Sequence, residues 1–442
     1  MTTERRIPAS RLGRISRLGR LAGGIASGLV SEGARQVAQG RRPRFNDLLL
    51  TPANARRLRD RMSEMRGAAM KVGQLLSMDS GNLLPAEFSE VLMGLREGAH
   101  HMPMVQLAKV LEESWGEGWE ADFKRFHITP RAAASIGQVH EAVLRDGRHI
   151  AVKIQYPGVR RSIDSDVANV ATLFRLIRLL PDDIDIEHIL DEAKRQLHDE
   201  ADYLKEAEAL KQYTILLGGD DRFRMPAVLD EMTTSTVLSM SYLTGDPIET
   251  VEQQADVVRN RVGTDLLELG IREVFNWGLV QTDPNFANYR YQQDTGVIEL
   301  LDFGATRRYS EQKQQALRDL LAACSDGDDS DVQHAAFDVG YLGDDDPAAY
   351  RRAIIDLLRT ATEPARAKQD YDFGSSDIAA RVSEIVVDMR LNEKYGRMPP
   401  VEVLFLHRKL GGLYLLLNRL RVRVPVRELV RAAVDQLPAY AL

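Results

Sequence analysis

The sequence of 442 residues contains a single cysteine, Cys324, and its nine histidines show no metal-site spacing. One cysteine excludes an intrachain disulfide framework and a cysteine-based zinc site. No run of about 18 apolar residues is present, so a membrane-spanning helix is not expected. The N-terminus also lacks the apolar core of a secretory signal. The net charge of −7 argues against a general polyanion binder, so nucleic acid is not an expected partner.

The charge that the chain does carry is unevenly distributed. Residues 1–42 hold nine arginines and two glutamates, a net charge of +7, which leaves −14 for the remainder. Apolar residues recur there every three or four positions, namely Leu12, Ile15, Leu18, Leu21 or Ala22, Ile25 and Leu29. This pattern predicts a basic amphipathic helix that lies in the interface of an anionic membrane. Two alternatives stay open, a helix packed on the rest of the protein and a mitochondrial transit peptide.

The order of the predicted elements indicates an α+β protein. Helical patterns cover 56–76, 103–115, 121–126, 162–180, 186–217 and most of the chain after 251. Strand patterns cover 132–144, 149–155 and 236–242, with short strands near 279–302. This order suits a two-lobed, protein-kinase-like fold with a small β-containing N-lobe and a helical C-lobe. We expect a basic segment (1–45), a helical extension (46–127), an N-lobe (128–243) and a C-lobe (244–442).

A phosphate-binding loop is the first of four kinase signals. Ala132-Ala133-Ala134-Ser135-Ile136-Gly137-Gln138-Val139 has the frame of the kinase glycine-rich loop, with alanines at the first two glycine positions. Glycine lets backbone amides approach phosphates, whereas a Cβ restricts that approach. We therefore expect these eight residues to contact the nucleotide from a stiffer loop.

The second signal is a lysine on the next strand. Ile150-Ala151-Val152-Lys153 matches the V-A-I-K pattern, whose lysine contacts the α- and β-phosphates. An acidic helical stretch that follows offers Glu200, Asp202 and Glu206 as partners for Lys153. Further on, Met240 and Tyr242 end a strand and enter a turn, as a hinge to adenine does.

The third and fourth signals supply a base and metal ligands. Asp283 and Asn288 have the D-x-x-x-x-N spacing of the kinase catalytic loop, although Gln281-Thr282 replaces the usual His-Arg. Asp302 opens a D-F-G sequence after an apolar strand. Asp283 can orient or deprotonate an attacking hydroxyl, while Asn288 and Asp302 offer oxygen ligands to Mg²⁺. A second D-F-G at 372–374 follows no such loop and is interpreted as a loop.

A further motif points to one family. Lys71-Val72-Gly73-Gln74 is not a general kinase feature and resembles the K-x-G-Q signature of the UbiB (AarF-domain) family. The alanine loop up to His140 and Glu200-Ala201-Asp202 resemble that family's alanine-rich loop and E-x-D motif. The segments that resemble its coenzyme Q subgroup are 281–288, 301–307 and 407–412. The resemblance runs from about Ile7 to Leu420, which favours a bacterial protein over a mitochondrial precursor.

This resemblance implies a mechanism and a setting. The helix with Lys71 and Gln74 would cover the active-site mouth, and Lys71 would meet Glu200 or Asp202, leaving Glu206 for Lys153. These four residues, Lys71, Gln74, Glu200 and Asp202, would regulate the site. The family uses ATP and Mg²⁺ and is associated with ATPase activity and an unorthodox kinase role in quinone synthesis. The expected partners are ATP, anionic membrane lipid, quinone-biosynthesis proteins or intermediates, and a second copy in a homodimer.

The expected location is the bacterial cytoplasm, with peripheral attachment to the inner membrane. Two other functions compete with this interpretation. One is an active protein or small-molecule kinase, and the other is a lipid-binding scaffold that only holds nucleotide. Retention of a base and metal ligands argues against the scaffold, because holding nucleotide needs neither.

Overall fold

The computed structural model describes residues 65–80, 101–176, 186–389 and 399–435. The predicted basic segment, residues 1–45, lies outside this part, as does the start of the helix predicted at 56–76. The described residues form two compact units. Unit 1 runs to Ala207 and includes Ala227–Tyr242, whereas unit 2 contains Glu208–Pro226 and the chain from Leu243 onward.

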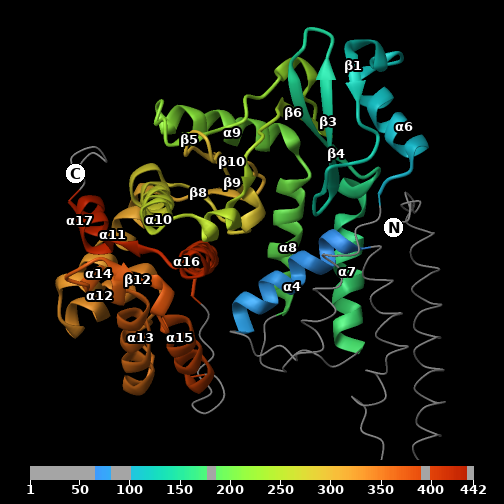
Figure 1. Cartoon of the computed structure of the whole chain (residues 1–442). Helices are drawn as coiled ribbons and strands as arrows, with labels where there is room; N and C mark the ends of the chain where they lie inside the picture. Colours follow the sequence, from blue (N-terminus) through green and yellow to red (C-terminus); the bar gives the residue numbers. More distant parts are fainter. Residues whose placement is uncertain (1–64, 81–100, 177–185, 390–398, 436–442) are drawn as a thin grey trace, which may run out of the picture. The chain divides into compact units, whose positions relative to one another are not determined.

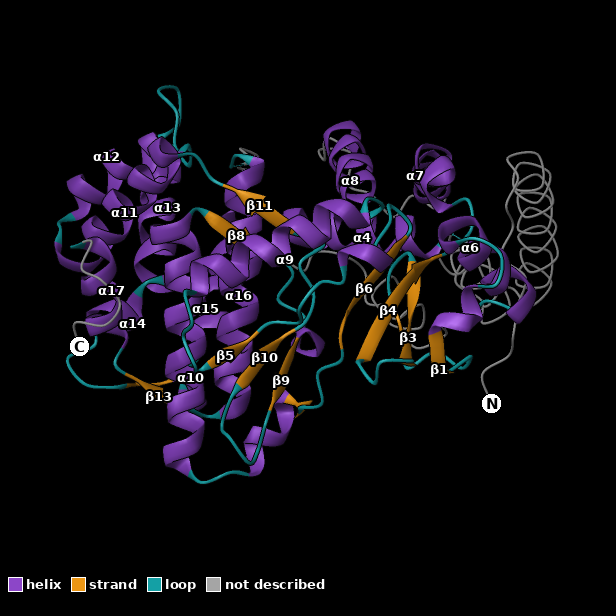
Figure 2. Ribbon diagram, turned by 90° about the horizontal axis from the view of Figure 1, so that it is seen from above, coloured by secondary structure: helices purple, strands orange, loops and turns teal. Residues whose placement is uncertain are grey.

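Unit 1 is built on a twisted antiparallel sheet (Figures 1 and 2), in which strands β1, β3, β4 and β6 follow one another and β2 pairs with β3. The strands are β1 (Phe123–Phe126), β2 (Ala132–Ala133), β3 (Gly137–Leu144), β4 (His149–Gln155) and β6 (Val237–Ser241). The register places Val139 opposite Lys153 and Lys153 opposite Leu238. The predicted hairpin is confirmed, and Gly147 adopts the positive φ of 93° that its turn requires.

The described part of unit 1 also contains five α-helical segments. They are α4 (Arg66–Ser80), α6 (Met104–Trp115), α7 (Val159–Leu176), α8 (Ile186–Glu200) and the first residues of α9 (Tyr203–Leu217). Of these, α4, α7 and α8 pack against one another. A core of buried apolar side chains joins α6 to the sheet; it consists of Met102, Leu107, Val110, Leu111, Trp119, Phe123, Ala142, Leu144, Ile150, Val152, Ile154, Leu229, Met232 and Val237.

Two predicted helices are wrong in detail. Residues 121–126 are the end of a 3₁₀ turn (Trp119–Asp122) and then strand β1, because β1 pairs with β3 and its phenylalanines pack edge-on against Trp119. The helix predicted over 186–217 is two helices. It breaks at Ala201–Asp202, where the Asp202 carboxylate accepts the N–H of Leu204 (3.3 Å), as a residue at a helix start does.

Unit 2 combines small sheets with a helical region. Its largest sheet has the order β5-β10-β9-β7, and β8 pairs with β11 while β12 pairs with β13. The strands are β5 (Phe223–Arg224), β7 (Asp246–Pro247), β8 (Leu279–Gln281), β9 (Tyr289–Tyr291), β10 (Ile298–Leu300), β11 (Thr306–Arg308), β12 (Tyr371–Asp372) and β13 (Arg423–Val424). The helices are α10 (Asp256–Ile271), α11 (Glu311–Asp326), α12 (Asp329–Val339), α13 (Ala348–Ala361), α14 (Glu363–Arg366), α15 (Ile378–Val387), α16 (Val401–Leu420) and α17 (Val426–Val434).

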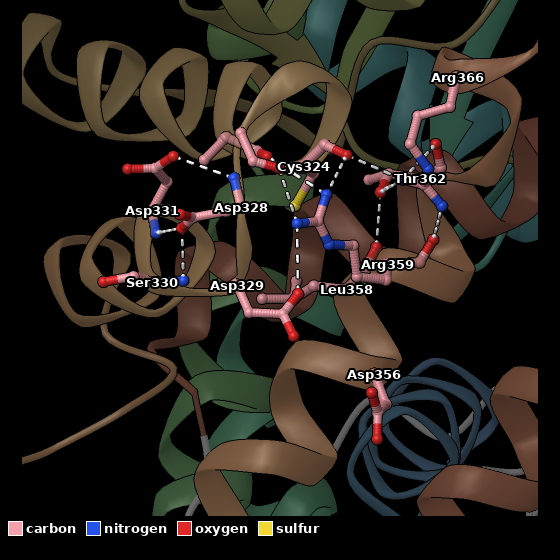
Figure 3. A network of polar contacts seen from close by, with 12 residues as sticks. Cys324, Asp328, Asp329, Ser330, Asp331, Asp356, Leu358, Arg359, Thr362 and Arg366 are labelled. Atoms are coloured by element: carbon pink, nitrogen blue, oxygen red, sulfur yellow. Dashed lines mark hydrogen bonds and ion pairs between the residues drawn. The ribbon is translucent and has the colours of Figure 1, made fainter.

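Two arginines, one from α13 and one from α14, donate hydrogen bonds to the end of α11 (Figure 3). Arg359 donates to the carbonyl groups of Cys324 (3.0 Å) and Gly327 (2.8 Å), and Arg366 donates to the Cys324 carbonyl as well (2.8 Å). These carbonyls belong to the end of α11, whose last backbone acceptors have no partner within the helix. Asp328 then starts α12 in a capping box with Asp331. This polar network is structural.

Two further findings bear on the predicted functions. Among the helices that the structure describes, none is long and apolar enough to cross a membrane. The second D-F-G is not a plain loop, because Asp372 belongs to β12 and its carboxylate accepts the N–H of Gly374 (3.0 Å). That carboxylate also pairs with Arg423, so it has a structural role.

Candidate active site

A buried ion pair lies at the centre of the sheet in unit 1. The ammonium group of Lys153 on β4 donates to both carboxylate oxygens of Glu206 on α9, at 2.8 and 2.9 Å. The side chains are 9% and 3% exposed. The ammonium group also lies 5.3 Å from the ring centroid of Tyr203. This arrangement holds a charged lysine at a fixed point beside the alanine-rich loop.

The alanine-rich loop is a tight hairpin end next to that lysine strand. Ala132 and Ala133 form β2, and the N–H of Ala134 donates to the carbonyl of Gly137 (2.9 Å). Val139 lies opposite Lys153 in the sheet. The loop therefore presents backbone groups at its turn.

Two side chains of the loop point into the protein. Ile136 is buried, and Gln138 is fully buried between the N–H of Met102 and the ring of His140. The side chains of Ile136 and Gln138 are thus part of the core, so only their backbone can serve a nucleotide.

Glu200 at the end of α8 connects the K-x-G-Q helix to this loop. Its carboxylate pairs with Lys71 of α4 and accepts the hydroxyl of Ser135 (3.0 Å). Helix α4 lies close to the loop, since a Cβ on Gly67 would lie 3.0 Å from Cγ2 of Ile136. The pairing of Lys71 with Glu200 and of Lys153 with Glu206 matches what the resemblance implies.

The remaining predicted residues of unit 1 have other surroundings. Asp202 pairs with Arg160 at 3.7 Å and not with Lys71. Gln74 lies on α4, and its side chain is outside the described part. Met240 is buried in β6, and the Tyr242 ring stacks on His149 with 4.3 Å between centroids.

In unit 2, the predicted base and a predicted metal ligand lie in contact. Asn288 donates its Nδ2 to the carboxylate (3.1 Å) and to the backbone carbonyl (3.2 Å) of Asp283. Because Nδ2 of Asn288 is engaged as a donor, the amide oxygen is the atom of this side chain that can hold a cation. Asp283 also pairs with Arg408 of α16, a contact that the sequence patterns did not predict.

Asp302 is brought beside this loop by the pairing of β9 with β10. The N–H of Leu301 donates to the carbonyl of Asn288 (3.0 Å). The side chain of Gln281 then links the two aspartates, because its Nε2 donates to the carbonyls of Asp283 (2.9 Å) and Asp302 (3.1 Å). Gln281 stands where ordinary kinases have histidine, and it holds the catalytic loop and the D-F-G segment together.

The ABC1 atypical kinase-like domain is recognised over residues 94–336, more than half of the chain. The chain belongs to the ABC1 atypical kinase-like family.

Its relatives cover nearly the whole chain. It is 36% identical over 428 residues to atypical kinase COQ8B, mitochondrial, of Rattus norvegicus, across 96% of this chain and 81% of the relative. It is 35% identical over 427 residues to atypical kinase COQ8, mitochondrial, of Saccharomyces cerevisiae, across 96% and 85%. The solved complex of Rv3197 with erythromycin from Mycobacterium tuberculosis superposes with a TM-score of 0.60 at 23% identity, across 95% of this chain and 100% of that one. The kinase-like fold and the family resemblance are confirmed.

This ABC1 kinase-like chain has a second buried lysine pair near the catalytic loop, which the sequence patterns did not predict. Lys409 of α16 pairs with Glu273 at 2.7 Å, and its ammonium group lies 3.4 Å from the hydroxyl of Tyr289. Burial disfavours a charged lysine, but Glu273 and Tyr289 outweigh it and raise the pKa of Lys409. The signal for this pair was adjacent charges followed by two glycines inside an apolar helix, at 407–412.

Each unit offers part of the chemistry of phosphoryl transfer. Unit 1 supplies a fixed lysine charge. Unit 2 supplies a carboxylate held by two donors, together with amide and carboxylate oxygens of the hard type that Mg²⁺ prefers. Among the described residues, no group of three or more histidine, cysteine, aspartate or glutamate side chains could hold a metal by itself.

Proposed function

We propose that this ABC1 kinase-like protein binds Mg-ATP and hydrolyses it slowly, in support of ubiquinone (coenzyme Q) biosynthesis at a membrane. The observation that carries the proposal is the retention of a complete phosphoryl-transfer set. Lys153 is held by Glu206, and Asp283, Asn288 and Asp302 are tied together around Gln281.

Each residue of the set takes one role in this proposal. Lys153 contacts the α- and β-phosphates, and the backbone of the alanine-rich loop lies along them. Asn288 and Asp302 would hold Mg²⁺, which would supply positive charge to the phosphates. Asp283 orients the attacking water and accepts its proton as the water oxygen bonds to the γ-phosphorus and the bond to the ADP oxygen breaks. Met240 and Tyr242 would lie near the adenine.

The loop and helix α4 favour a small acceptor over a protein. Ser135 and Lys71 share Glu200, so the K-x-G-Q helix is bonded to the segment that approaches the phosphates. Such a helix restrains the loop. The site is regulated by Lys71 and Gln74 of this helix together with Glu200 and Asp202. An active protein or small-molecule kinase is the alternative function, and it predicts accumulation of a phosphorylated product.

The link to quinone synthesis and to membranes rests on the relatives and on charge. The similar proteins of rat and yeast are named atypical kinases COQ8B and COQ8, both mitochondrial. Residues 1–42 carry nine arginines, each of which adds roughly 1 kcal/mol of attraction near an anionic surface. We propose peripheral attachment to an anionic bilayer, the inner membrane in a bacterial cell. Vesicle flotation with and without residues 1–42 tests this, and equal flotation of both forms would remove the proposal.

ATP turnover by the wild type and by Asp302→Asn tests the proposed function. The variant loses a charged metal ligand, so Mg-ATP binding should weaken and turnover should fall by roughly 100-fold. Phosphate release to water supports ATPase activity, whereas a phosphorylated product favours the kinase alternative. Wild-type protein that binds ATP without turnover would leave only the scaffold.

A further inference from the structure

Helix α16 contacts the catalytic loop along one stripe. Arg408 pairs with Asp283, and Gly412 lies against the next residue, Pro284, where a Cβ would be only 2.0 Å from Cβ of the proline. Lys409 forms the buried pair beneath the loop. Positions 408 and 412 are one turn apart on the same face of a helix. The sequence His407–Gly412 therefore builds the surface on which the catalytic loop rests.

Both oxygens of the Asp283 carboxylate are held, and one holder comes from α16. Nη2 of Arg408 donates to Oδ1, and Nδ2 of Asn288 donates to Oδ2 (3.1 Å). Two donors on the two oxygens fix the plane of the carboxylate. The catalytic loop supplies only the weaker, neutral donor, because Gln281-Thr282 contains no cation.

The burial of Arg408 is hard to explain by stability alone. Its side chain is 11% exposed, and its Nη1 is buried without a hydrogen-bond partner among the described residues. An unsatisfied buried donor opposes folding, and buried ion pairs add little stability compared with apolar side chains. An arginine kept under these conditions, with its charge on the predicted base, fits a role in the reaction.

We propose that Arg408 is a positioning residue for phosphoryl transfer, which fixes the Asp283 carboxylate from helix α16. The inference rests on the proposed function and extends it to a residue outside the kinase motifs. Without Arg408 the carboxylate can rotate away from the attacking oxygen, so the transfer rate falls. Nucleotide binding is not affected, because Lys153 and the metal ligands provide it.

Steady-state ATP turnover of Arg408→Met, Arg408→Lys, Asp283→Asn and the double variant Arg408→Met/Asp283→Asn tests this. Misplacement of a reacting group lowers rates by up to about 100-fold, so kcat of Arg408→Met should fall about tenfold or more. KM for Mg-ATP should stay within about threefold. Arg408→Lys should recover part of the rate, and the double variant should be no slower than Asp283→Asn, because residues that act as a unit are not additive.

Arg427→Met is the matched control. This arginine of α17 pairs with Asp326 at 3.6 Å, away from the catalytic loop, and its loss should leave kcat unchanged. If Arg408→Met does not fold, Arg408→Lys carries the test, and it must lower kcat at constant KM. An unchanged or faster kcat, or a higher KM with kcat unchanged, overturns the inference while an active wild type preserves the proposed function. A wild type without turnover overturns the proposed function itself.

Discussion

Lys153 pairs with Glu206 in unit 1, and Lys409 pairs with Glu273 in unit 2, with every one of the four side chains less than a tenth exposed. Each lysine also has a tyrosine neighbour. Lys153 lies over the ring face of Tyr203, whereas Lys409 approaches the hydroxyl of Tyr289. The two pairs thus have almost the same chemistry.

Their positions in the fold separate them. Lys153 lies on a strand next to the alanine-rich loop, opposite Val139. Lys409 lies on a helix beneath the catalytic loop, and Gly412 on the same helix touches Pro284. The pair in unit 1 is expected to serve the reaction, and the pair in unit 2 is expected to hold the loop in place.

Replacing each pair by neutral side chains should reveal the functional difference between the two pairs most clearly. Lys153→Met/Glu206→Gln should lower ATP turnover by roughly 100-fold or more, since it removes the charge on the phosphates. Lys409→Met/Glu273→Gln should keep turnover within about tenfold, since neutral replacements of a buried pair are often tolerated. Thermal unfolding of both proteins is the control for folding. Equal loss of turnover in the two double variants would show that the pairs do not differ in function.

Removing only one member of the unit 2 pair should have the largest effect on stability. Lys409→Met leaves Glu273 charged and buried without its partner, so the free energy of unfolding should fall by about 3–5 kcal/mol. Adding Glu273→Gln should restore most of it. Urea denaturation of the two variants measures this coupling. A double variant as unstable as Lys409→Met would mean that Lys409 contributes through packing and not through its charge.

Features set by neighbouring residues could be predicted from the sequence, whereas features set by contacts between distant residues could not. The hairpin of β3 and β4 was predictable because two short apolar runs flank Arg145-Asp146-Gly147, all within a short stretch. The break between α8 and α9 was missed, since it depends on the carboxylate of Asp202 accepting the N–H of Leu204. Strand β1 was missed because its pairing with β3 and its aromatic contacts override local helix patterns.

In the candidate site, too, the motif residues could be predicted and the long-range contacts could not. The resemblance narrowed the partners of Lys71 to two and assigned Glu206 to Lys153, and Glu200 is the partner of Lys71 in the structure. The pairing of Arg408 with Asp283 joins residues 125 positions apart. No periodicity links such positions, and only the contact of α16 with the loop brings them together. The link made by Gln281 also depends on a tertiary contact.

Unit 2 also contains a buried aspartate, Asp220, whose ionisation makes the stability of the fold depend on pH. Burial opposes ionisation of Asp220, but hydrogen bonds from Arg222 (2.8 Å) and Arg272 (2.7 Å) outweigh it and lower its pKa from 3.8 to about 2. Because the folded protein releases this proton more readily than the unfolded chain, the pairing stabilises the fold above about pH 4. The stabilisation is lost as the pH falls toward 2 and amounts to about 2 kcal/mol.

Asp220→Asn should therefore be less stable than the wild type by about 2 kcal/mol or more at pH 5–7, with the gap closing below pH 4. Urea denaturation at pH 7, 5, 4 and 3 measures it. A gap that stays constant down to pH 3 would show that the carboxylate charge is not the source of the stability.

The smallest change to stability, but an informative one for unit 1, is expected for Ala134→Gly. Ala134 stands at the second glycine position of the kinase loop, and its N–H closes the turn onto the carbonyl of Gly137 (2.9 Å). Glycine removes a Cβ where backbone must approach phosphate and frees angles barred to alanine. Tighter nucleotide binding should follow, at a loss of roughly 0.5–1 kcal/mol in stability without nucleotide.

If the alanine restrains the transfer reaction, the variant should also phosphorylate itself. The modified site should lie in the chain's own N-terminal region, because helix α4 lies against the loop at Gly67 and Ile136 and is proposed to keep other proteins from it. Nucleotide titration together with mass spectrometry of the phosphopeptides measures both effects. Ala133→Gly is the matched control, because it adds the same flexibility at a position between the two glycine positions of the frame. Equal behaviour of the two variants would mean that loop stiffness in general, and not the Cβ of Ala134, sets the affinity; unchanged affinity without a phosphopeptide would mean that the alanine-rich loop does not restrain the reaction.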